Sequence, residues 1–276
     1  MSHEIVKTVP AAFLFDVDGV ITNPVEKKVT EPELFDELAN LLSNGVPVAL
    51  VTGRALPWVV ERVVTPLTNL IEDKSILDRF FVSGEFGASQ IRWKNGEAYR
   101  LVDTTITLPE GLADELKEAT KPYKTTQHID PDKETMVSIE MNDGLAVNEF
   151  KPEQLKLARE LEGLLERYSP EGKFEIHIDR IATNIKNKST NKRYAARQVN
   201  AWLSELKLLP HQYFAFGDSS SDREMADELH AEGKSITFVF VGNEEELGAR
   251  GEGYETVITQ KHCDEGTLEF LKSQTL

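Results

Sequence analysis

The sequence has little of several features, and each shortage excludes a class of protein. Among 276 residues there is one cysteine, Cys263, so an internal disulfide is impossible. No run of apolar residues approaches the ~20 that a membrane span requires. The start of the chain, MSHEIVKTVP, lacks the apolar core of a signal peptide. We therefore expect a cytoplasmic protein with no disulfide and no membrane partner.

Positive charge is also scarce. The chain has 31 lysine and arginine residues against 47 aspartate and glutamate residues, which gives a formal net charge of −16 and a pI of about 4.9. A surface that follows nucleic-acid phosphates is therefore not expected. An anionic small molecule needs local cations or a metal ion to bind against this field. The 40% apolar and 28% charged residues are ordinary for a globular protein with one large domain, or with a core domain and an insert.

The most informative stretch is residues 12–22, AFLFDVDGVIT. Its apolar start is too short for a helix and is typical of a buried parallel strand. Asp16 and Asp18 come directly after it, where open α/β sheets bind ligands. A calcium loop counted from Asp16 fails on spacing, because Ile21 and Lys27 stand where its glycine and glutamate belong. The alternative is a polar loop that only solvates the end of a strand.

Buried runs and amphipathic helices alternate along much of the chain. Further apolar runs are at 46–51, 80–82, 213–216 and 236–241, with a short edge at 256–259, and helical periodicity is found at 31–44, 56–67 and 192–206. Such βαβ alternation is typical of parallel sheets with helices on both faces. The sequence therefore predicts an α/β fold, a doubly wound, Rossmann-like parallel sheet.

The pattern changes between residues 86 and 182. Asn95-Gly96, between two possible strands, is a strong hairpin signal. A strand at 136–141, a long amphipathic helix after it and an alternating strand at 174–178 follow. We therefore predict an inserted α+β domain over 86–182, with a core domain formed by 1–85 and 183–276.

Polar side chains are expected at four strand ends or helix starts. They are Asp16 with Asp18, Thr52, Lys192, and Asp218 with Asp222. Each has a structural explanation: the threonine can cap a helix, the lysine can be a solvated first-turn residue, and the last two acids can be turn and N-cap residues. Together, carboxylates, a hydroxyl and an ammonium suit Mg²⁺-assisted phosphoryl transfer.

These motifs resemble those of the haloacid-dehalogenase-like phosphohydrolases. FLFDVDGV is similar to the first motif of that superfamily, LVTGR to the second, the lysine of STNKRYAA to the third and FGDSSSD to the fourth. An insert between the second and third motifs resembles the subclass with a large α+β cap, which includes trehalose-phosphate and sucrose-phosphate phosphatases and phosphomannomutases. SGEFGAS at 83–89 is similar to the stretch entering the cap of trehalose-phosphate phosphatases, although Phe86 stands where those usually have histidine.

The resemblance implies roles for these residues. Asp16 is the expected nucleophile, which forms an aspartyl-phosphate, and Asp18 the expected general acid and base. Thr52, the Gly53 amide and Lys192 are expected to bind phosphate. The expected ligands of a Mg²⁺ cofactor are the Asp16 carboxylate, the Asp18 carbonyl, Asp218 and Asp222, the last directly or through water.

The resemblance does not name the substrate. A phosphorylated sugar or sugar-like metabolite is expected, with Arg54, Glu85 and Arg180 as candidate contacts. Two alternatives stay open: a sugar phosphomutase similar to phosphomannomutases, and a non-catalytic binding protein on the same fold. Ser221 stands where many relatives have asparagine, so the hydrogen bonding beside Asp222 is open. The chain is expected to be a monomer or a homodimer.

Overall fold

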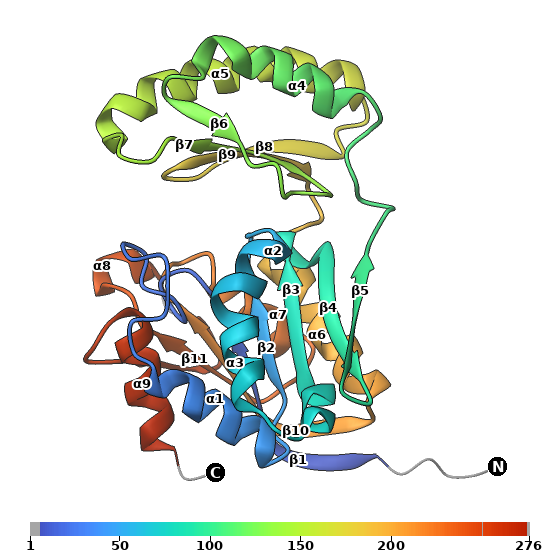
Figure 1. Cartoon of the computed structure of the whole chain (residues 1–276), viewed down its shortest axis with the longest axis vertical. Coiled ribbons are helices and arrows are strands. Elements are labelled where there is room, and N and C mark those ends of the chain that lie inside the picture. Colours follow the sequence, from blue (N-terminus) through green and yellow to red (C-terminus); the bar gives the residue numbers. More distant parts are fainter. Residues whose placement is uncertain (1–5, 250, 275–276) are drawn as a thin grey trace, which may run out of the picture. The chain divides into compact units, whose positions relative to one another are not determined.

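The computed structural model describes residues 6–249 and 251–274. The chain divides into two compact units, one made of Met1–Leu101 with Asn191–Leu276 and the other of Val102–Thr190 (Figure 1). The second unit is inserted into the first between β5 and α6. Each unit has its own sheet and its own hydrophobic core, so each is described separately.

The larger unit is built on a sheet with the strand order β12-β11-β10-β1-β2-β3-β4-β5. Its strands are β1 (Lys7–Phe15), β2 (Val48–Val51), β3 (Phe80–Gly84), β4 (Ser89–Lys94), β5 (Glu97–Val102), β10 (Leu208–Gly217), β11 (Ile236–Phe240) and β12 (Glu255–Ile258). The strands from β12 to β3 pair in parallel, and β4 pairs antiparallel with β3. This confirms the predicted doubly wound α/β fold.

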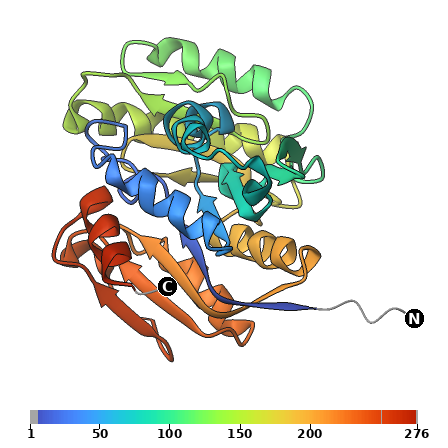
Figure 2. The ribbon, with the colours of Figure 1, turned by 60° about the horizontal axis from the view of Figure 1, so that its bottom comes forward.

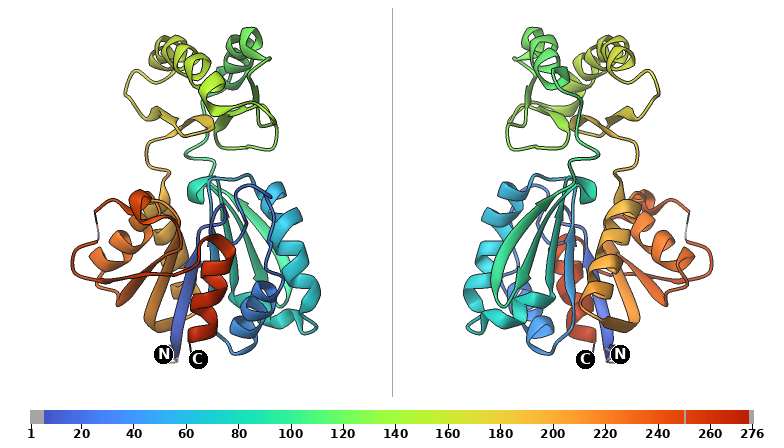
Figure 3. Two further views of the ribbon diagram at one scale, coloured as in Figure 1. Left: turned by 90° about the vertical axis from the view of Figure 1, so that its left-hand side faces the viewer. Right: turned by 90° about the vertical axis from the view of Figure 1, so that its right-hand side faces the viewer.

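Helices cover both faces of this sheet (Figure 3). They are α1 (Glu33–Ser43), α2 (Leu56–Val59), α3 (Thr65–Leu70), α6 (Lys192–Glu205), α7 (Arg223–Ala231), α8 (Glu244–Leu247) and α9 (Cys263–Ser273). Apolar side chains of α1, α2, α3 and α9 pack on one face, and those of α6 and α7 pack on the other. A π-helical turn, Val60–Val64, joins α2 to α3 where the sequence predicted one continuous helix.

Strand β1 lies inside the sheet, between β10 and β2 (Figure 2). Its side chains alternate, so Phe13 and Phe15 enter one core and Leu14 the other. Phe15 is level with Phe216 of β10 and with Leu50 of β2. Because the chain continues to β2 on one side and returns to β10 on the other, the end of β1 is the topological switch point where such sheets bind ligands.

The smaller unit is an antiparallel sheet, ordered β6-β7-β9-β8, with α4 and α5 on one face. Its elements are α4 (Leu112–Thr120), β6 (Gln127–Ile129), β7 (Val137–Met141), α5 (Val147–Tyr168), β8 (Phe174–Ile178) and β9 (Ala182–Asn187). Residues such as Ile139 and Ile185 point to the helices and form its core with Leu116, Leu157 and Leu161. Separate strands and helices in this arrangement are typical of an α+β unit.

The limits of the two units differ from the predicted ones at 86 and 182. The predicted hairpin exists, but β4 pairs with β3 and so belongs to the large sheet. The strand Ala182–Asn187 pairs with β7 and β8 and so belongs to the small sheet. In both places the hydrogen bonds to a neighbouring strand determine which sheet the strand belongs to, and the periodicity of the sequence does not indicate these bonds. Among the described residues, no helix combines the length and apolarity that a membrane span requires.

Candidate functional site

Four loops bring the predicted polar residues of the larger unit together at the carboxyl edge of its sheet. Asp16 follows β1, Thr52 follows β2, and Asp218 follows β10, which are adjacent strands. Lys192 opens α6, and Asp222 directly precedes α7. The register of β1 with both neighbours sets the strand ends level, so positions far apart in sequence become neighbours in space.

Three carboxylates form the centre of this site. One oxygen from each of Asp16, Asp218 and Asp222 lies within 4.8 Å of the others. Gly19 makes this approach possible, because a Cβ atom at this position would overlap the Asp218 carboxylate. The glycine also has a φ of 72°, which is costly for other residues. The turn after β1 therefore needs glycine on two counts.

Asp222 organises the loop after β10. Its Oδ2 accepts hydrogen bonds from the Asp218 amide at 3.2 Å and from the amide and hydroxyl of Ser219 at 3.1 and 2.7 Å. The Ser219 hydroxyl also lies 2.9 Å from that of Ser221. Asp222 thus keeps the backbone around Asp218 in place. The Ser221 hydroxyl joins this network through the Ser219 hydroxyl.

Lys192 is the cation at the centre of the cluster. It is 6% exposed, so the alternative of a solvated first-turn lysine does not hold. Its ammonium pairs with Asp16, lies 3.0 Å from an oxygen of Asp222 and donates to the Val51 carbonyl at 2.9 Å. Burial acts against its charge, but Asp16 and Asp222 outweigh burial and raise the pKa of Lys192.

One ammonium cannot neutralise three carboxylates, and the pKa values reflect this. Burial raises the pKa of Asp16 to about 7, against the lowering effect of Lys192 and with further raising by Asp222 and Asp18. Burial together with the charges of Asp16 and Asp222 raises the pKa of Asp218 to about 8. The site therefore holds more negative charge than it can stabilise by itself, which is the condition that a bound cation relieves.

The donor set fits a hard divalent cation. Carboxylate oxygens within one coordination sphere, with excess negative charge, are what Mg²⁺ or a similar ion requires. Within the described residues, Lys192 is the one side-chain donor to the Asp16 carboxylate, which leaves the second Asp16 oxygen for the ion. Asp222 already accepts several hydrogen bonds, so its contribution suits a water-mediated contact.

The loop after β2 carries the predicted phosphate-binding residues. Thr52 is 1% exposed, and its hydroxyl accepts a hydrogen bond from the Arg54 amide at 3.0 Å, which leaves the hydroxyl proton available as a donor. Its carbonyl accepts from the Phe86 amide at 3.0 Å. The Phe86 ring packs on Gly53, where a Cβ atom would overlap it. Thr52 therefore does not cap the following helix, whose N-cap is Ala55, and its hydroxyl is instead hydrogen-bonded within the loop after β2.

Asp18 has a partner that the sequence did not suggest. Arg54 donates to both of its carboxylate oxygens, with the Nε atom 3.0 Å from Oδ2 and an Nη atom 3.0 Å from Oδ1. The guanidinium carbon lies 4.8 Å from the centre of the Trp58 ring. The two residues of the ion pair are 36 positions apart, so only tertiary structure reveals it. The spacing of Arg54, Trp58 and Arg62 by four residues was the available sequence signal for the stacking.

The other predicted substrate contacts lie in different surroundings. Glu85, directly after β3, has no exposed surface, and its amide donates to the Arg54 carbonyl at 3.0 Å. Glu85 and Phe86 have φ values of 49° and 56°, so two non-glycine residues adopt the left-handed conformation beside the Thr52 loop. Arg180 belongs to the smaller unit, in the turn between β8 and β9, and is exposed.

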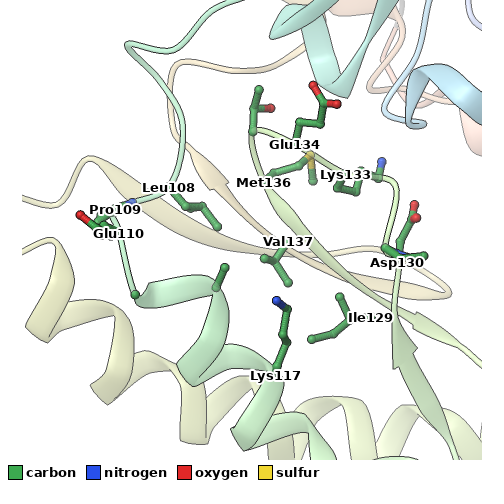
Figure 4. Close-up of a pocket in the computed structure, with 14 residues that line it drawn as sticks. Leu108, Pro109, Glu110, Lys117, Ile129, Asp130, Lys133, Glu134, Met136 and Val137 are labelled. Atoms are coloured by element: carbon green, nitrogen blue, oxygen red, sulfur yellow. The ribbon is translucent and has the colours of Figure 1, made fainter.

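The smaller unit contains a cavity of about 320 Å³ beside the start of α4 and the segment between β6 and β7 (Figure 4). Its lining mixes the charges of Lys117, Lys133, Glu110 and Glu134 with apolar residues such as Met136. Within the described residues, the one group of three or more clustered metal-ligating side chains is the Asp16 cluster. Among the described residues, the lining of this cavity thus contains no such cluster of metal ligands.

Comparisons with known proteins support the fold. No protein-family model matches the sequence, and no curated protein matches it either. A haloacid dehalogenase-like hydrolase from Bacteroides thetaiotaomicron has a similar structure at 15% identity, with a TM-score of 0.65, and the match covers 96% of this chain and 99% of that one.

Two trehalose-6-phosphate phosphatases are similar as well. The Aspergillus fumigatus enzyme matches at 17% identity with a TM-score of 0.56, over 96% of this chain and 93% of its own. The Candida albicans C-terminal domain matches at 15% identity with a TM-score of 0.64, over 95% and 90%. The predicted resemblance to haloacid-dehalogenase-like hydrolases is confirmed at the level of the fold.

Proposed function

We propose that the protein is a Mg²⁺-dependent phosphatase that hydrolyses a phosphate monoester of a sugar or sugar-like metabolite. The observation that carries this proposal is the convergence of Asp16, Asp218, Asp222 and a buried Lys192 at one strand edge. Phosphate monoesters are among the slowest substrates to hydrolyse without a catalyst. A dense arrangement of opposite charges, with a nucleophile at its centre, is what their hydrolysis demands.

In the first step, a carboxylate oxygen of Asp16 attacks phosphorus, and the bond from phosphorus to the alcohol oxygen breaks. Asp18 gives its proton to that oxygen, so a neutral alcohol leaves and an aspartyl-phosphate remains. Lys192 keeps Asp16 oriented and balances charge on the phosphoryl oxygens, while Thr52 and the Gly53 amide hold those oxygens.

In the second step, Asp18, now a carboxylate, takes a proton from water as the water oxygen attacks the same phosphorus. The bond to Asp16 breaks, inorganic phosphate leaves, and Asp18 again carries the proton for the next turnover. The Asp16 carboxylate, the Asp18 carbonyl and the Asp218 carboxylate would hold the Mg²⁺, and Asp222 would contact it through water. Bound there, the ion would supply positive charge that offsets the negative charge of the phosphoryl group and of the Asp16 carboxylate.

The choice of a sugar phosphate rests on similarity to the trehalose-6-phosphate phosphatases and on the inserted α+β unit. The assignment of substrate selection to that unit, with Arg180 as one contact, stays a prediction. It is tested by the KM of Arg180→Ala against each substrate found.

The test is a screen of phosphorylated metabolites with the purified protein, with and without Mg²⁺, in which released phosphate is measured. We expect release from at least one sugar phosphate, loss of release with a chelator, and loss of release in Asp16→Asn. Asp36→Asn, the same chemical change at an exposed position on α1, is the matched control and should keep full activity.

Three outcomes would contradict the proposal or its assignment of Asp16. Isomerisation of a sugar phosphate without net phosphate release would establish a phosphomutase. Tight Mg²⁺-dependent binding of a ligand with no turnover would establish a binding protein. Equal activity in Asp16→Asn would remove Asp16 as the nucleophile.

A further inference from the structure

Arg54 and Asp18 form an ion pair in which the guanidinium contacts both carboxylate oxygens. The Arg54 Nε atom lies 3.2 Å from Oδ1 and 3.0 Å from Oδ2, and an Nη atom lies 3.0 Å from Oδ1. The side chains are 18% and 35% exposed. A planar fork that meets both oxygens fixes the rotation of a carboxylate, which a lysine ammonium does not.

Arg54 is itself held from several directions. Its amide donates to the Thr52 hydroxyl at 3.0 Å, and its carbonyl accepts from the Glu85 amide at 3.0 Å. Its guanidinium stacks on the Trp58 ring, and Arg62 stacks on that ring as well, with its guanidinium carbon 4.7 Å from the ring centre. The backbone hydrogen bonds and the Trp58 ring therefore order Arg54 independently of its contact with Asp18.

The loop after β1 holds the Asp18 backbone through a bridge to Thr22, but within the described residues the Asp18 carboxylate pairs with Arg54 alone. Asp18 directly precedes Gly19, which has a φ of 72°. A group that transfers a proton must stay within hydrogen-bond reach of the reacting oxygen. The fork supplies the orientation that this loop does not.

We propose that Arg54 is a positioning residue for Asp18, with Trp58 as the platform that orders Arg54. This rests on the proposed phosphatase function. Oδ1 accepts two hydrogen bonds from the fork and Oδ2 only one, so Oδ2 has a second lone pair that can carry the proton given to the leaving oxygen and later taken from water. Arg54 keeps all of its own protons throughout, because its guanidinium does not deprotonate in proteins.

The test compares two leaving groups through kcat/KM, which reports the steps up to formation of the aspartyl-phosphate. An alkyl phosphate needs protonation of its leaving oxygen, and p-nitrophenyl phosphate does not. For Arg54→Met we expect a loss of about 100-fold on the alkyl ester and of no more than about fivefold on p-nitrophenyl phosphate, the difference expected from losing a general acid. A structural or phosphate-binding role would lower both equally.

Arg62→Met is the matched control, because it removes a cation from the same Trp58 ring and leaves the fork in place; it should act like the unmodified protein on both esters. Arg54→Lys keeps the charge but not the fork, and we expect a loss of about tenfold on the alkyl ester alone. This variant also serves if Arg54→Met fails to fold.

Equal losses on the two esters, or no loss, in an otherwise active enzyme would overturn the positioning role and leave the proposed function standing. Absence of turnover of both esters by the unmodified protein would overturn both.

Discussion

Lys192 offers the most informative perturbation of the site. It is one buried ammonium among three carboxylates, so Lys192→Met leaves Asp16 and Asp222 without their cation and the Val51 carbonyl without its donor. Removal of one partner from a buried ion pair destabilises proteins by about 3–5 kcal/mol. We expect a loss of about 3 kcal/mol in the free energy of unfolding without metal at pH 8, measured by urea denaturation.

The loss should depend on pH in a definite direction. The pKa of Asp16 is about 7 in the folded protein, above its usual 3.8. When the pKa of a carboxyl group is higher in the folded than in the unfolded state, its contribution to stability is fully present at a pH below the unfolded-state pKa. This contribution is lost as the pH rises through the folded-state pKa. Without Lys192 that pKa rises further, so the variant should lose most stability at pH 8 and least near pH 5.

Two comparisons make the result specific. Lys117→Met removes an exposed lysine paired with Asp114 and should change stability by less than about 0.5 kcal/mol. Mg²⁺ should restore part of the stability that Lys192→Met loses, because the ion replaces the missing positive charge. A loss below about 1 kcal/mol at pH 8, or a loss that grows as the pH falls, would refute the charge balance described for the site.

Two further predictions concern the metal ligands. Because Asp16 and Asp218 have pKa values of about 7 and 8 without metal, Mg²⁺ must displace protons, so its affinity should rise more than about tenfold from pH 6 to 8.5. Calorimetry in two buffers measures this, and a pH-independent affinity would contradict it. Gly19→Ala should displace the Asp218 carboxylate and weaken Mg²⁺ binding at least about tenfold, with a strain of about 1–2 kcal/mol. Gly233→Ala, at a φ of 76° with nothing within 4 Å of its Cβ, should lose stability but bind Mg²⁺ normally.

Much of the fold and of the site could be predicted because local sequence carries them. The apolar run before Asp16 determines a buried strand, and parallel pairing brings the ends of β1, β2 and β10 to one edge. That geometry gathers Asp16, Thr52 and Asp218 without any knowledge of side-chain contacts. The order of the four motifs then indicated that Lys192 belongs to the site and is not an exposed surface lysine.

The remainder depends on tertiary contacts that periodicity does not encode. The sequence of the hairpin at 88–102 does not indicate which sheet the hairpin joins. The pairing of β4 with β3 makes it part of the large sheet. The three-residue strand Gln127–Ile129 is too short to give a periodic signal. The Arg54 fork on Asp18 and the left-handed backbone at Glu85 arise from packing between separate loops.

The central claim is that Asp16 carries the phosphoryl group during turnover. The direct measurement is to quench the protein with borohydride during turnover of a phosphate ester with Mg²⁺, since borohydride reduces an acyl phosphate to an alcohol, and then to locate the modified residue by peptide mass spectrometry. We predict that the Asp16 side chain alone is reduced to an alcohol, and only when both the ester and Mg²⁺ are present. Turnover with no conversion at Asp16, or conversion at another carboxylate, would contradict the account.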